Sequence, residues 1–409
     1  MRNVYCWVIL VCIFFVYMSS NGMVLNTFTQ YTPELMKFWG LDFKQASSFQ
    51  STIYLVLALP LPFVGKLLEK YPVKNLMMVG AIGTLISLLI FANANSIGMM
   101  RLFTILFPLF LSGLGLLSCM YLINNWFLKY RGIATGVLLM ASSVGPFWFA
   151  KILGKWIAVH GWQKAALYEA ILCGILIIIP VFFIKNHPKD VNGFADGIEG
   201  NLGGQPVIDA VAAKAHYKKA TGSLNFYLVV IVTAVLWFCI GGLFVHHGLY
   251  LNGLNLDAKQ IGAVSSLFFL CGLVGKLIFG FLSDKIDVKQ MMLWSVFAML
   301  LGCILLYLSV QNNNLMYVYA IVLGAGYSGT FTMIQLYALR LYSGPAYGSI
   351  LGLLSFVDTL CLALGGLVFG IIRKNGTDYS SAFLLMVVLT IISLLATYFI
   401  NKRTDKSVY

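Results

Sequence analysis

Twelve apolar segments of about 20 residues each occupy most of this 409-residue chain. A segment of that length crosses the ~30 Å hydrocarbon core of a bilayer as a helix. Only 10% of the residues are charged, against about a quarter in soluble domains, which excludes a water-soluble fold. The sequence therefore predicts an all-α membrane protein with twelve transmembrane helices. We expect them near residues 4–28, 45–65, 75–95, 102–127, 132–157, 164–184, 225–250, 260–282, 290–310, 314–338, 346–372 and 380–400.

The basic residues are unevenly distributed between the loops on the two sides. With the N-terminus inside, 17 of the 27 Lys and Arg lie in cytoplasmic loops, nine lie outside and Lys276 lies within a segment. Because Lys and Arg favour the cytoplasmic side, we expect both termini in the cytoplasm and a location in the cell (inner or plasma) membrane. The net charge of +13 thus reflects topology. A nucleic-acid partner is not expected, since the sequence has no basic stripe.

All eight Cys fall inside the apolar segments, with no CxxC or Cys/His cluster. They are interpreted as small buried apolar residues, so neither a disulfide framework nor a metal site nor a cofactor is expected. Enzyme motifs such as HExxH and GxSxG are absent, and we do not expect catalysis.

The longest polar interruption, Lys185 to Ser223, separates the sixth segment from the seventh. Its Asn, Gly, Asp and Lys content predicts a flexible linker, which includes a short amphipathic stretch near 208–219. We expect three parts: an N-terminal six-helix bundle at 1–185, a cytoplasmic linker loop at 186–224 and a C-terminal six-helix bundle at 225–409.

The two halves carry matching motifs at a nearly constant offset. Residues 65–74 (GKLLEKYPVK) and 280–289 (GFLSDKIDVK) both have Gly, an acid four positions later, and Lys five and nine positions later. Residues 132–136 and 348–352 likewise begin and end with Gly. Such a repeat predicts two pseudo-symmetric six-helix bundles with a site between them at the midplane.

In the first motif, the Gly allows close helix approach, and the acid can meet a helix N-terminus or a basic partner. The residues assigned to this gating-loop motif are Gly65, Glu69, Lys70, Gly280, Asp284 and Lys285.

These motifs resemble those of the major facilitator superfamily over essentially the whole chain. Residues 125–136 (NWFLKYRGIATG) and 275–285 (GKLIFGFLSDK) are similar to helices 5 and 8 of its monocarboxylate and oxalate/formate transporter branch. Pro72 and Val288 replace the Gly that is usual in the loop motif. The resemblance implies the major facilitator fold and transport of a small molecule, surrounded by membrane lipid, by a chain that works as a monomer.

Lys276 and Asp358 are the clearest charged residues inside apolar segments. Ionisable groups within a span are costly and mark function. At 1.5 Å per residue, they lie ~12 Å and ~18 Å from the cytoplasmic face, so we expect them to approach each other. The alternative is a buried ion pair that only fixes helix packing. Their counterparts in the first half, Leu61 and Ser142, are uncharged, which favours function.

By resemblance, Lys276 binds an anionic group of the substrate, and we expect Asp358 to take up the proton that is coupled to transport. Lys replaces the Arg usual in the family, and Gly272 stands where vertebrate-type members carry Asp. Since Asp358 would repel a dianion, we predict a proton-coupled symporter of a small monocarboxylate that works by alternating access. The alternative substrate is an amino acid or another small zwitterion. A channel is not expected, because two pseudo-symmetric halves are typical of a carrier.

Five further polar side chains are expected along the path. Asn21 lies in a polar break of the first segment, and the resemblance implies Tyr121 and Tyr327 at the substrate. His246 and His247 lie near the outer boundary, where one of them can relay protons. Adjacent residues on a helix point apart, so at most one faces the cavity. Interhelical hydrogen bonding and interfacial packing are the alternative roles.

Glu169 lies ~10 Å into the sixth segment from the outside. We expect it to snorkel to the boundary or to pair with Lys151 or Lys155, rather than to contact substrate.

Overall fold

The computed structural model describes residues 4–201, 210–254, 258–373 and 378–400. Within these residues the regular structure is helical, without a β-strand. Among the described residues, twelve helical spans are long and apolar enough to cross a membrane, which confirms the predicted all-α, twelve-span architecture. A helix satisfies its own backbone hydrogen bonds, which is why lipid-spanning segments of this composition become helices.

Spans 1, 2 and 4 are built from more than one helix, and the others are single helices. The first six spans are α1 (Tyr5–Tyr17) continued by η2 (Met18–Leu25), η3 (Phe28–Tyr31) and α2 (Thr32–Trp39); α3 (Phe43–Ala58) with α4 (Leu61–Lys70); α5 (Val73–Ala92); α6 (Ile97–Leu114) with α7 (Leu116–Trp126); α8 (Arg131–His160); and α9 (Trp162–Phe183). The last six are α11 (Leu224–Gly253), α12 (Ala258–Ser283), α13 (Val288–Ser309), α14 (Met316–Tyr342), α15 (Tyr347–Ile372) and α16 (Ser380–Phe399).

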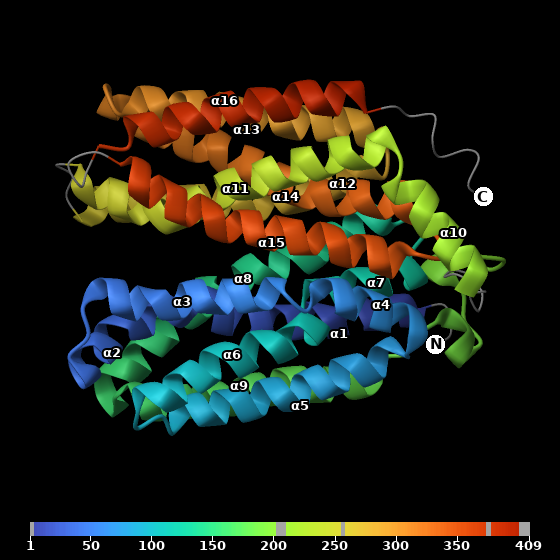
Figure 1. The fold of residues 1–409 in the computed structure, drawn as a ribbon, viewed down its shortest axis with the longest axis horizontal. Helices are drawn as coiled ribbons and strands as arrows, with labels where there is room; N and C mark the ends of the chain where they lie inside the picture. Colours follow the sequence, from blue (N-terminus) through green and yellow to red (C-terminus); the bar gives the residue numbers. More distant parts are fainter. Residues whose placement is uncertain (1–3, 202–209, 255–257, 374–377, 401–409) are drawn as a thin grey trace. The chain divides into compact units, whose positions relative to one another are not determined.

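The helices group into two compact units (Figure 1). Unit 1 comprises Met1–Tyr130, Val137–Ala210 and Pro345–Phe356, and unit 2 comprises Arg131–Gly136, Val211–Gly344 and Val357–Tyr409. The start of α8 therefore belongs to unit 2, and the start of α15 belongs to unit 1. The division at 186–224 stays a prediction.

In unit 1, span 1 is irregular where the sequence has its polar break. α5 packs against α6 and α9, and α9 packs against α1 and the π-helical turn η2 (Figure 1). The hydroxyls of Ser19 and Ser20 each donate to a carbonyl one turn earlier, at 2.7 Å. π-Helical turns occur frequently at functional sites, and Asn21 lies within this one.

Span 4 is broken at Gly115, between α6 and α7. Gly115 has a ψ of −149°, and Ser118 Oγ donates to the carbonyl of Gly113 at 2.6 Å. This side chain satisfies a carbonyl that the break frees. A Cβ added to Gly115 would lie 3.5 Å from Asn21 Nδ2. The irregular parts of spans 1 and 4 thus meet inside unit 1.

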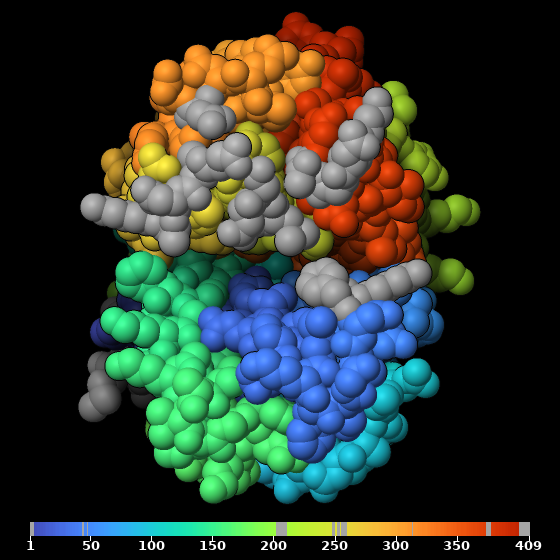
Figure 2. Space-filling model, turned by 90° about the vertical axis from the view of Figure 1, so that its left-hand side faces the viewer, coloured from blue at the N-terminus to red at the C-terminus, as the bar shows by residue number. Residues whose placement is uncertain are grey.

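At one end of unit 1, α2 packs on the turn between α8 and α9. The ring centroids of Phe38 and Trp39 lie 5.5 and 5.7 Å from that of Trp162, and Trp162 lies 5.5 Å from Phe91. Figure 2 shows the blue residues of α2 beside the green residues of this turn.

In unit 2, α14 is the central helix. It packs against α12 and α13, while α16 packs against α11 and α13 (Figure 1). Most residues in the second half of α14 are buried. Side chains on α14 are therefore positioned by neighbours on several sides.

The described part of the linker contains regular structure. Two short 3₁₀ turns, η4 (Pro188–Val191) and η5 (Ala195–Gly197), precede α10 (Ala210–Thr221), which lies close to the predicted amphipathic stretch. Residues 202–209 of the linker lie outside the described residues.

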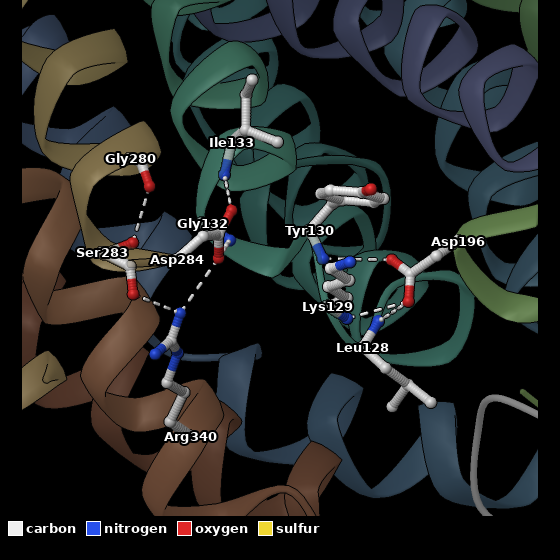
Figure 3. Close-up of polar contacts among 10 residues, drawn as sticks. All are labelled: Leu128, Lys129, Tyr130, Gly132, Ile133, Asp196, Gly280, Ser283, Asp284 and Arg340. Carbon is white, nitrogen blue, oxygen red and sulfur yellow. Dashed lines mark hydrogen bonds and ion pairs between the residues drawn. The ribbon is translucent and has the colours of Figure 1, made fainter. Parts of the chain in front are cut away.

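Asp196 attaches the linker to the loop between α7 and α8. Its carboxylate, in a residue 5% exposed, accepts the N–H groups of Leu128, Lys129 and Tyr130 at 3.0, 2.8 and 3.1 Å (Figure 3). These three bonds fasten the linker at residue 196 to that loop. Sequence reasoning missed Asp196, because it resembles any other linker Asp.

Candidate functional site

The ammonium group of Lys276 lies among aromatic rings inside unit 2. Lys276, on α12, is 1% exposed, and its Nζ lies 4.9 Å from the ring centroid of Phe331 and 5.9 Å from that of Tyr327. Ring faces attract cations, more strongly where water is excluded. Among the described residues, Lys276 is the one buried Lys or Arg.

The two rings over Lys276 belong to α14 and contact further rings of α11 and α12. Tyr327 stacks on Phe268 at 5.9 Å and meets the edge of Phe244 at 5.1 Å. Phe331 lies 5.1 Å from Trp237. Tyr327, predicted at the substrate, is therefore a neighbour of the buried cation.

Asp358, on α15, is buried against α11. It is 5% exposed and its carboxyl faces Thr233 and Trp237. Among the described residues, neither its Oδ1 nor the Nε1 of Trp237 has a hydrogen-bond partner at the usual distance, although both atoms are buried. This carboxyl therefore has unused hydrogen-bonding capacity.

The structure does not join Lys276 and Asp358 as an ion pair. Lys37–Glu34 and Arg340–Asp284 are ion pairs of the described residues, and neither involves Asp358. The stem of Lys276 brings its ammonium to the α14 rings, whereas Asp358 faces α11. The two residues therefore belong to the same unit without forming an ion pair with each other.

The adjacent histidines have different environments. His246 contacts Tyr379 Oη at 3.1 Å and the carbonyl of Gly366 at 2.9 Å, so both ring nitrogens have protein partners. His247 contacts Tyr319 Oη through Nε2 at 3.3 Å. His246, on α11, is therefore linked to α15 and to Tyr379, the residue before α16.

A cavity of ≈ 210 Å³ lies between α11 and α12. His247 is part of its wall and His246 is not. The cavity is lined by Leu243, Phe244, His247, Ser265, Phe268 and Phe269. Of the two histidines, His247 is thus the one that a small molecule or water in this cavity would meet.

Asn21 and Tyr121 lie in unit 1, whereas Tyr327 lies in unit 2. Asn21 is half-buried at the irregular part of span 1. Tyr121 stacks on Tyr347 at 6.1 Å, beside the start of α15. Tyr121 is therefore near the gating-loop motif, since Glu69 of that motif contacts the same turn of α15.

The expectation for Glu169 is wrong. Its side chain does not reach the boundary, since the residue is 1% exposed, and no ion pair of the described residues joins it to Lys151 or Lys155. Instead, Tyr31 Oη donates to Glu169 Oε2 at 2.7 Å. The rotation of α9 about its axis turns this residue into unit 1.

The acid of the second loop motif caps the start of α8. The two carboxylate oxygens of Asp284 accept the N–H groups of Gly132 and Ile133 at 2.7 and 2.9 Å, and Arg340 lies 3.0 Å away (Figure 3). Negative charge at a helix N-terminus is favourable. The carboxylate therefore meets both kinds of partner that the motif predicts.

The acid of the first loop motif makes the corresponding contact in unit 1. Glu69 accepts the N–H of Ser349, in the first turn of α15, at 2.5 Å. The backbones are close here, because a Cβ on Gly65 would overlap the carbonyl of Gly348. The repeat in the sequence thus corresponds to a repeated contact.

The lysines of the motif have two kinds of neighbour. Lys74 Nζ donates to the carbonyl of Phe182 at 2.6 Å, and Lys289 Nζ donates to that of Ile400 at 2.6 Å. Cations are favourable at helix C-termini, and these carbonyls are at the ends of α9 and α16. Lys70 lies over the ring of the next residue, Tyr71, at 5.4 Å, and Lys285 lies over the ring of Phe281, four residues earlier, at 4.2 Å.

The described residues contain no group of three or more His, Cys, Asp or Glu arranged to hold a metal ion. The eight Cys are free thiols.

A family model described as Major Facilitator Superfamily matches residues 9–259 and 231–408, which is nearly the whole chain. The chain belongs to this superfamily. Its members are carriers, so the protein is a multi-pass membrane transporter and not an enzyme.

Three relatives illustrate the similarity, and two of them are named for substrates. An uncharacterized MFS-type transporter of Bacillus subtilis, YcxA, is 22% identical over 81% of this chain and 78% of its own. The sialic acid transporter NanX of Escherichia coli is 24% identical over 68% of this chain and 65% of its own. A probable hexose phosphate transport protein of Chlamydia trachomatis is 24% identical over 64% of this chain and 61% of its own.

Solved structures of the superfamily share the fold. The proton:xylose symporter XylE matches with a TM-score of 0.79 and 12% identity, over 98% of this chain and 97% of its own. At this identity the likeness concerns the fold alone. The relatives do not identify the monocarboxylate branch, which stays a prediction.

Proposed function

We propose that this transporter carries a small organic monoanion, such as a monocarboxylate, together with a proton by alternating access. The observation that carries the proposal is a buried cation and a buried acid in the same compact unit, Lys276 and Asp358, which are 1% and 5% exposed and not paired with each other. Buried ionisable groups within a membrane are costly, and two such groups suit a carrier that binds one anion and one proton.

Lys276 would bind the anionic group of the substrate. An ion pair away from water is much stronger than the same pair at a surface. One buried cation balances one negative charge, which favours a monoanion over a dianion. Because Tyr327 and Phe331 lie over Lys276, these rings must turn aside when the substrate enters.

Asp358 would carry the proton. Burying an ionised carboxylate with an oxygen that lacks a hydrogen bond is unfavourable, so its neutral form suits the conformation described above. Trp237 faces Asp358 and also contacts Phe331. Rotation of Phe331 away from Lys276 would then disturb the surroundings of the carboxyl, which couples substrate and proton.

The names of the relatives are compatible with an anionic substrate. Sialic acid is itself a monocarboxylate, whereas a hexose phosphate can carry two negative charges. A sugar acid therefore has the same charge count as a lactate-type acid. An amino acid or another zwitterion is the second candidate, because Asp358 adds a negative group to the site.

The starts of α8 and α15, which Asp284 and Glu69 cap, would form the cytoplasmic gate. Alternation of the two halves, residues 1–185 and 225–409, must release the N–H groups held by Asp284 and Glu69. The excess of Lys and Arg in the loops on this side supports cytoplasmic termini in the plasma membrane.

Ligand-induced thermal stabilisation tests the substrate class, since a ligand that binds only the native state raises the unfolding temperature. The probes are lactate, N-acetylneuraminate, glucose 6-phosphate and alanine, applied to purified protein at one pH. The proposal expects a shift with one of the two monocarboxylates, and this shift should disappear in Lys276→Gln. The matched control is Lys155→Gln, which removes an exposed lysine. A shift with alanine alone would establish the second candidate instead.

Proton coupling is tested with the probe that binds, in proteoliposomes that contain a pH-sensitive dye. Wild-type protein should acidify the lumen as the probe enters, and Asp358→Asn should exchange the probe without acidification. Proton-coupled accumulation that persists in Asp358→Asn would contradict the role of this residue.

A further inference from the structure

Glu169 is a buried acid that the transport site proposed above does not use. It lies on α9 in unit 1, is 1% exposed, and accepts one hydrogen bond from Tyr31 at 2.7 Å. Its other oxygen, Oε1, is buried and has no hydrogen-bond partner among the described residues. One of the two carboxyl oxygens therefore has no hydrogen bond to the described residues.

The surroundings of this carboxyl are aromatic. Tyr31, which is also 1% exposed, meets the ring of Phe91 edge-on at 4.9 Å and lies 6.3 Å from Phe28. Tyr31 belongs to η3 of span 1, so the ring that covers Glu169 and the acid itself come from different helices.

Few titratable groups face Glu169 from the elements around it. Besides Tyr31, the nearby one is Cys173, one turn further along α9. Lys74 of α5 and Tyr5 of α1 instead donate to carbonyls at the C-terminal end of α9. No ion pair within the described residues provides a cation for Glu169.

These surroundings accommodate the neutral acid better than the carboxylate. Removing an unpaired carboxylate from water costs several kcal/mol, whereas a neutral acid can accept from Tyr31 through one oxygen and carry the proton on the other. A change of protonation therefore requires that water reach the group. Separation of span 1, which carries Tyr31, from α9 would uncover the carboxyl.

Span 1 is irregular next to this contact. Its π-helical turn η2 packs against α9, and Cys173 Sγ lies 4.0 Å from the carbonyl of Ser19 in that turn. A 3₁₀ turn then places Tyr31 over the acid. Irregular helical turns of this kind often mark hinges, so span 1 has the local structure that such a movement needs.

We propose that Glu169 is a second proton-binding site of this transporter, closed by Tyr31 and opened to water when span 1 separates from α9. Its ligand is the proton alone. The proposal is independent of the substrate and of Asp358, since the site lies in unit 1 and is tested without any substrate.

Infrared difference spectroscopy of reconstituted protein measures the protonation directly, through the carbonyl stretch of a neutral carboxylic acid. Near neutral pH, wild-type protein should show such a band that is absent from Glu169→Gln and present in Asp358→Asn. Tyr31→Phe should shift the frequency of this band, because the hydrogen bond to the carboxyl is lost. The control Tyr168→Phe, which changes a tyrosine on α9 beside Glu169, should leave the frequency unchanged. Identical spectra for wild type and Glu169→Gln would refute the proposal.

Transfer of the same membranes to D2O tests whether the site opens. The Glu169 band should shift as the acid exchanges its proton, and Tyr31→Phe should exchange about five-fold faster, because a net hydrogen bond worth about 1 kcal/mol is lost from the closed form. A band that never exchanges in folded wild-type protein would make Glu169 a permanently neutral structural acid and would overturn the proposal. The wild-type measurement keeps this test decisive even if a variant does not fold.

Discussion

Replacement of Asp284 by Asn should open the contact between α12 and the start of α8 without unfolding the protein. Asp284 accepts two backbone N–H groups, at 2.7 and 2.9 Å, and holds Arg340 at 3.0 Å. Asn has one acceptor oxygen and no charge. Its side chain can therefore accept only one of the two backbone N–H groups. The ion pair with Arg340 and the favourable negative charge at the helix N-terminus are lost.

The magnitude follows from these contacts. Hydrogen bonds to charged groups contribute about 1.5–3 kcal/mol each, roughly twice as much as neutral ones, and the charge at the helix start adds about 0.3–1 kcal/mol. Arg340 keeps its bond to the carbonyl of Ser283 at 2.7 Å, which limits the loss. Losing one charged bond, about half of the other and the charge at the helix start costs the closed form about 3–5 kcal/mol in all, so that the open fraction rises about 100- to 5000-fold.

A cysteine in place of Ser283 reports this opening. Ser283 is fully buried and lies against the start of α8, because a Cβ on Gly132 would overlap its hydroxyl. Maleimide labelling of Ser283→Cys, quantified by peptide mass spectrometry so that the native thiols do not interfere, should accelerate by the stated factor when Asp284→Asn is added.

The control is Asp287→Asn, three residues further along. It makes the same change of charge, and the backbone N–H groups that Asp287 accepts, those of Lys289 and Gln290, lie at the start of α13. Equal labelling rates at residue 283 with Asp284→Asn and with Asp287→Asn would refute the view that Asp284 closes this contact.

Three further variants test other parts of the fold. Asp196→Ala should lower the free energy of unfolding by roughly 3 kcal/mol, because three N–H groups lose a carboxylate acceptor; thermal unfolding followed by tryptophan fluorescence measures this. Lys289→Gln should lower the free energy of unfolding by about 1 kcal/mol in the same assay, since the last turn of α16 loses its cation. An unchanged midpoint of thermal unfolding would refute this capping role. Burial and the nearby Lys219 hold the pKa of His216 below its usual value of 6.5, so the unfolded chain binds the proton more readily. Stability should therefore fall as the pH drops below about 6.5, and a comparison of unfolding midpoints at several pH values should show a smaller fall in His216→Gln.

The spans and the repeated contacts could be predicted from the sequence. Apolar segments of membrane length must become helices, because lipid offers no other partner for the backbone. The acids at 69 and 284 were expected to meet a helix N-terminus or a basic partner, and each of them accepts a backbone N–H group at the start of a helix. Local spacing was sufficient here, since the motif has a short, rigid loop and glycines that allow a close approach.

The surroundings of the charged residues inside the spans were not predictable in the same way. Counting residues along a helix gives depth, and depth alone placed Lys276 and Asp358 within reach of each other and Glu169 near the boundary. In the structure, Lys276 lies under α14 rings and Glu169 lies under Tyr31. Depth does not give the rotation of a helix about its axis, and rotation decides which neighbour a side chain meets.

The sequence by itself thus determined the twelve spans, the superfamily resemblance and the internal repeat, because each depends on composition and local spacing. Only the tertiary structure decided that Phe331 and Trp237 contact the two charged groups of unit 2, and that Asp196 fastens the linker. These contacts join residues far apart in the chain, and they arise from the packing of uniformly apolar helices. Because lipid and protein interior are equally apolar, the hydropathy pattern cannot tell which face of such a helix points inward.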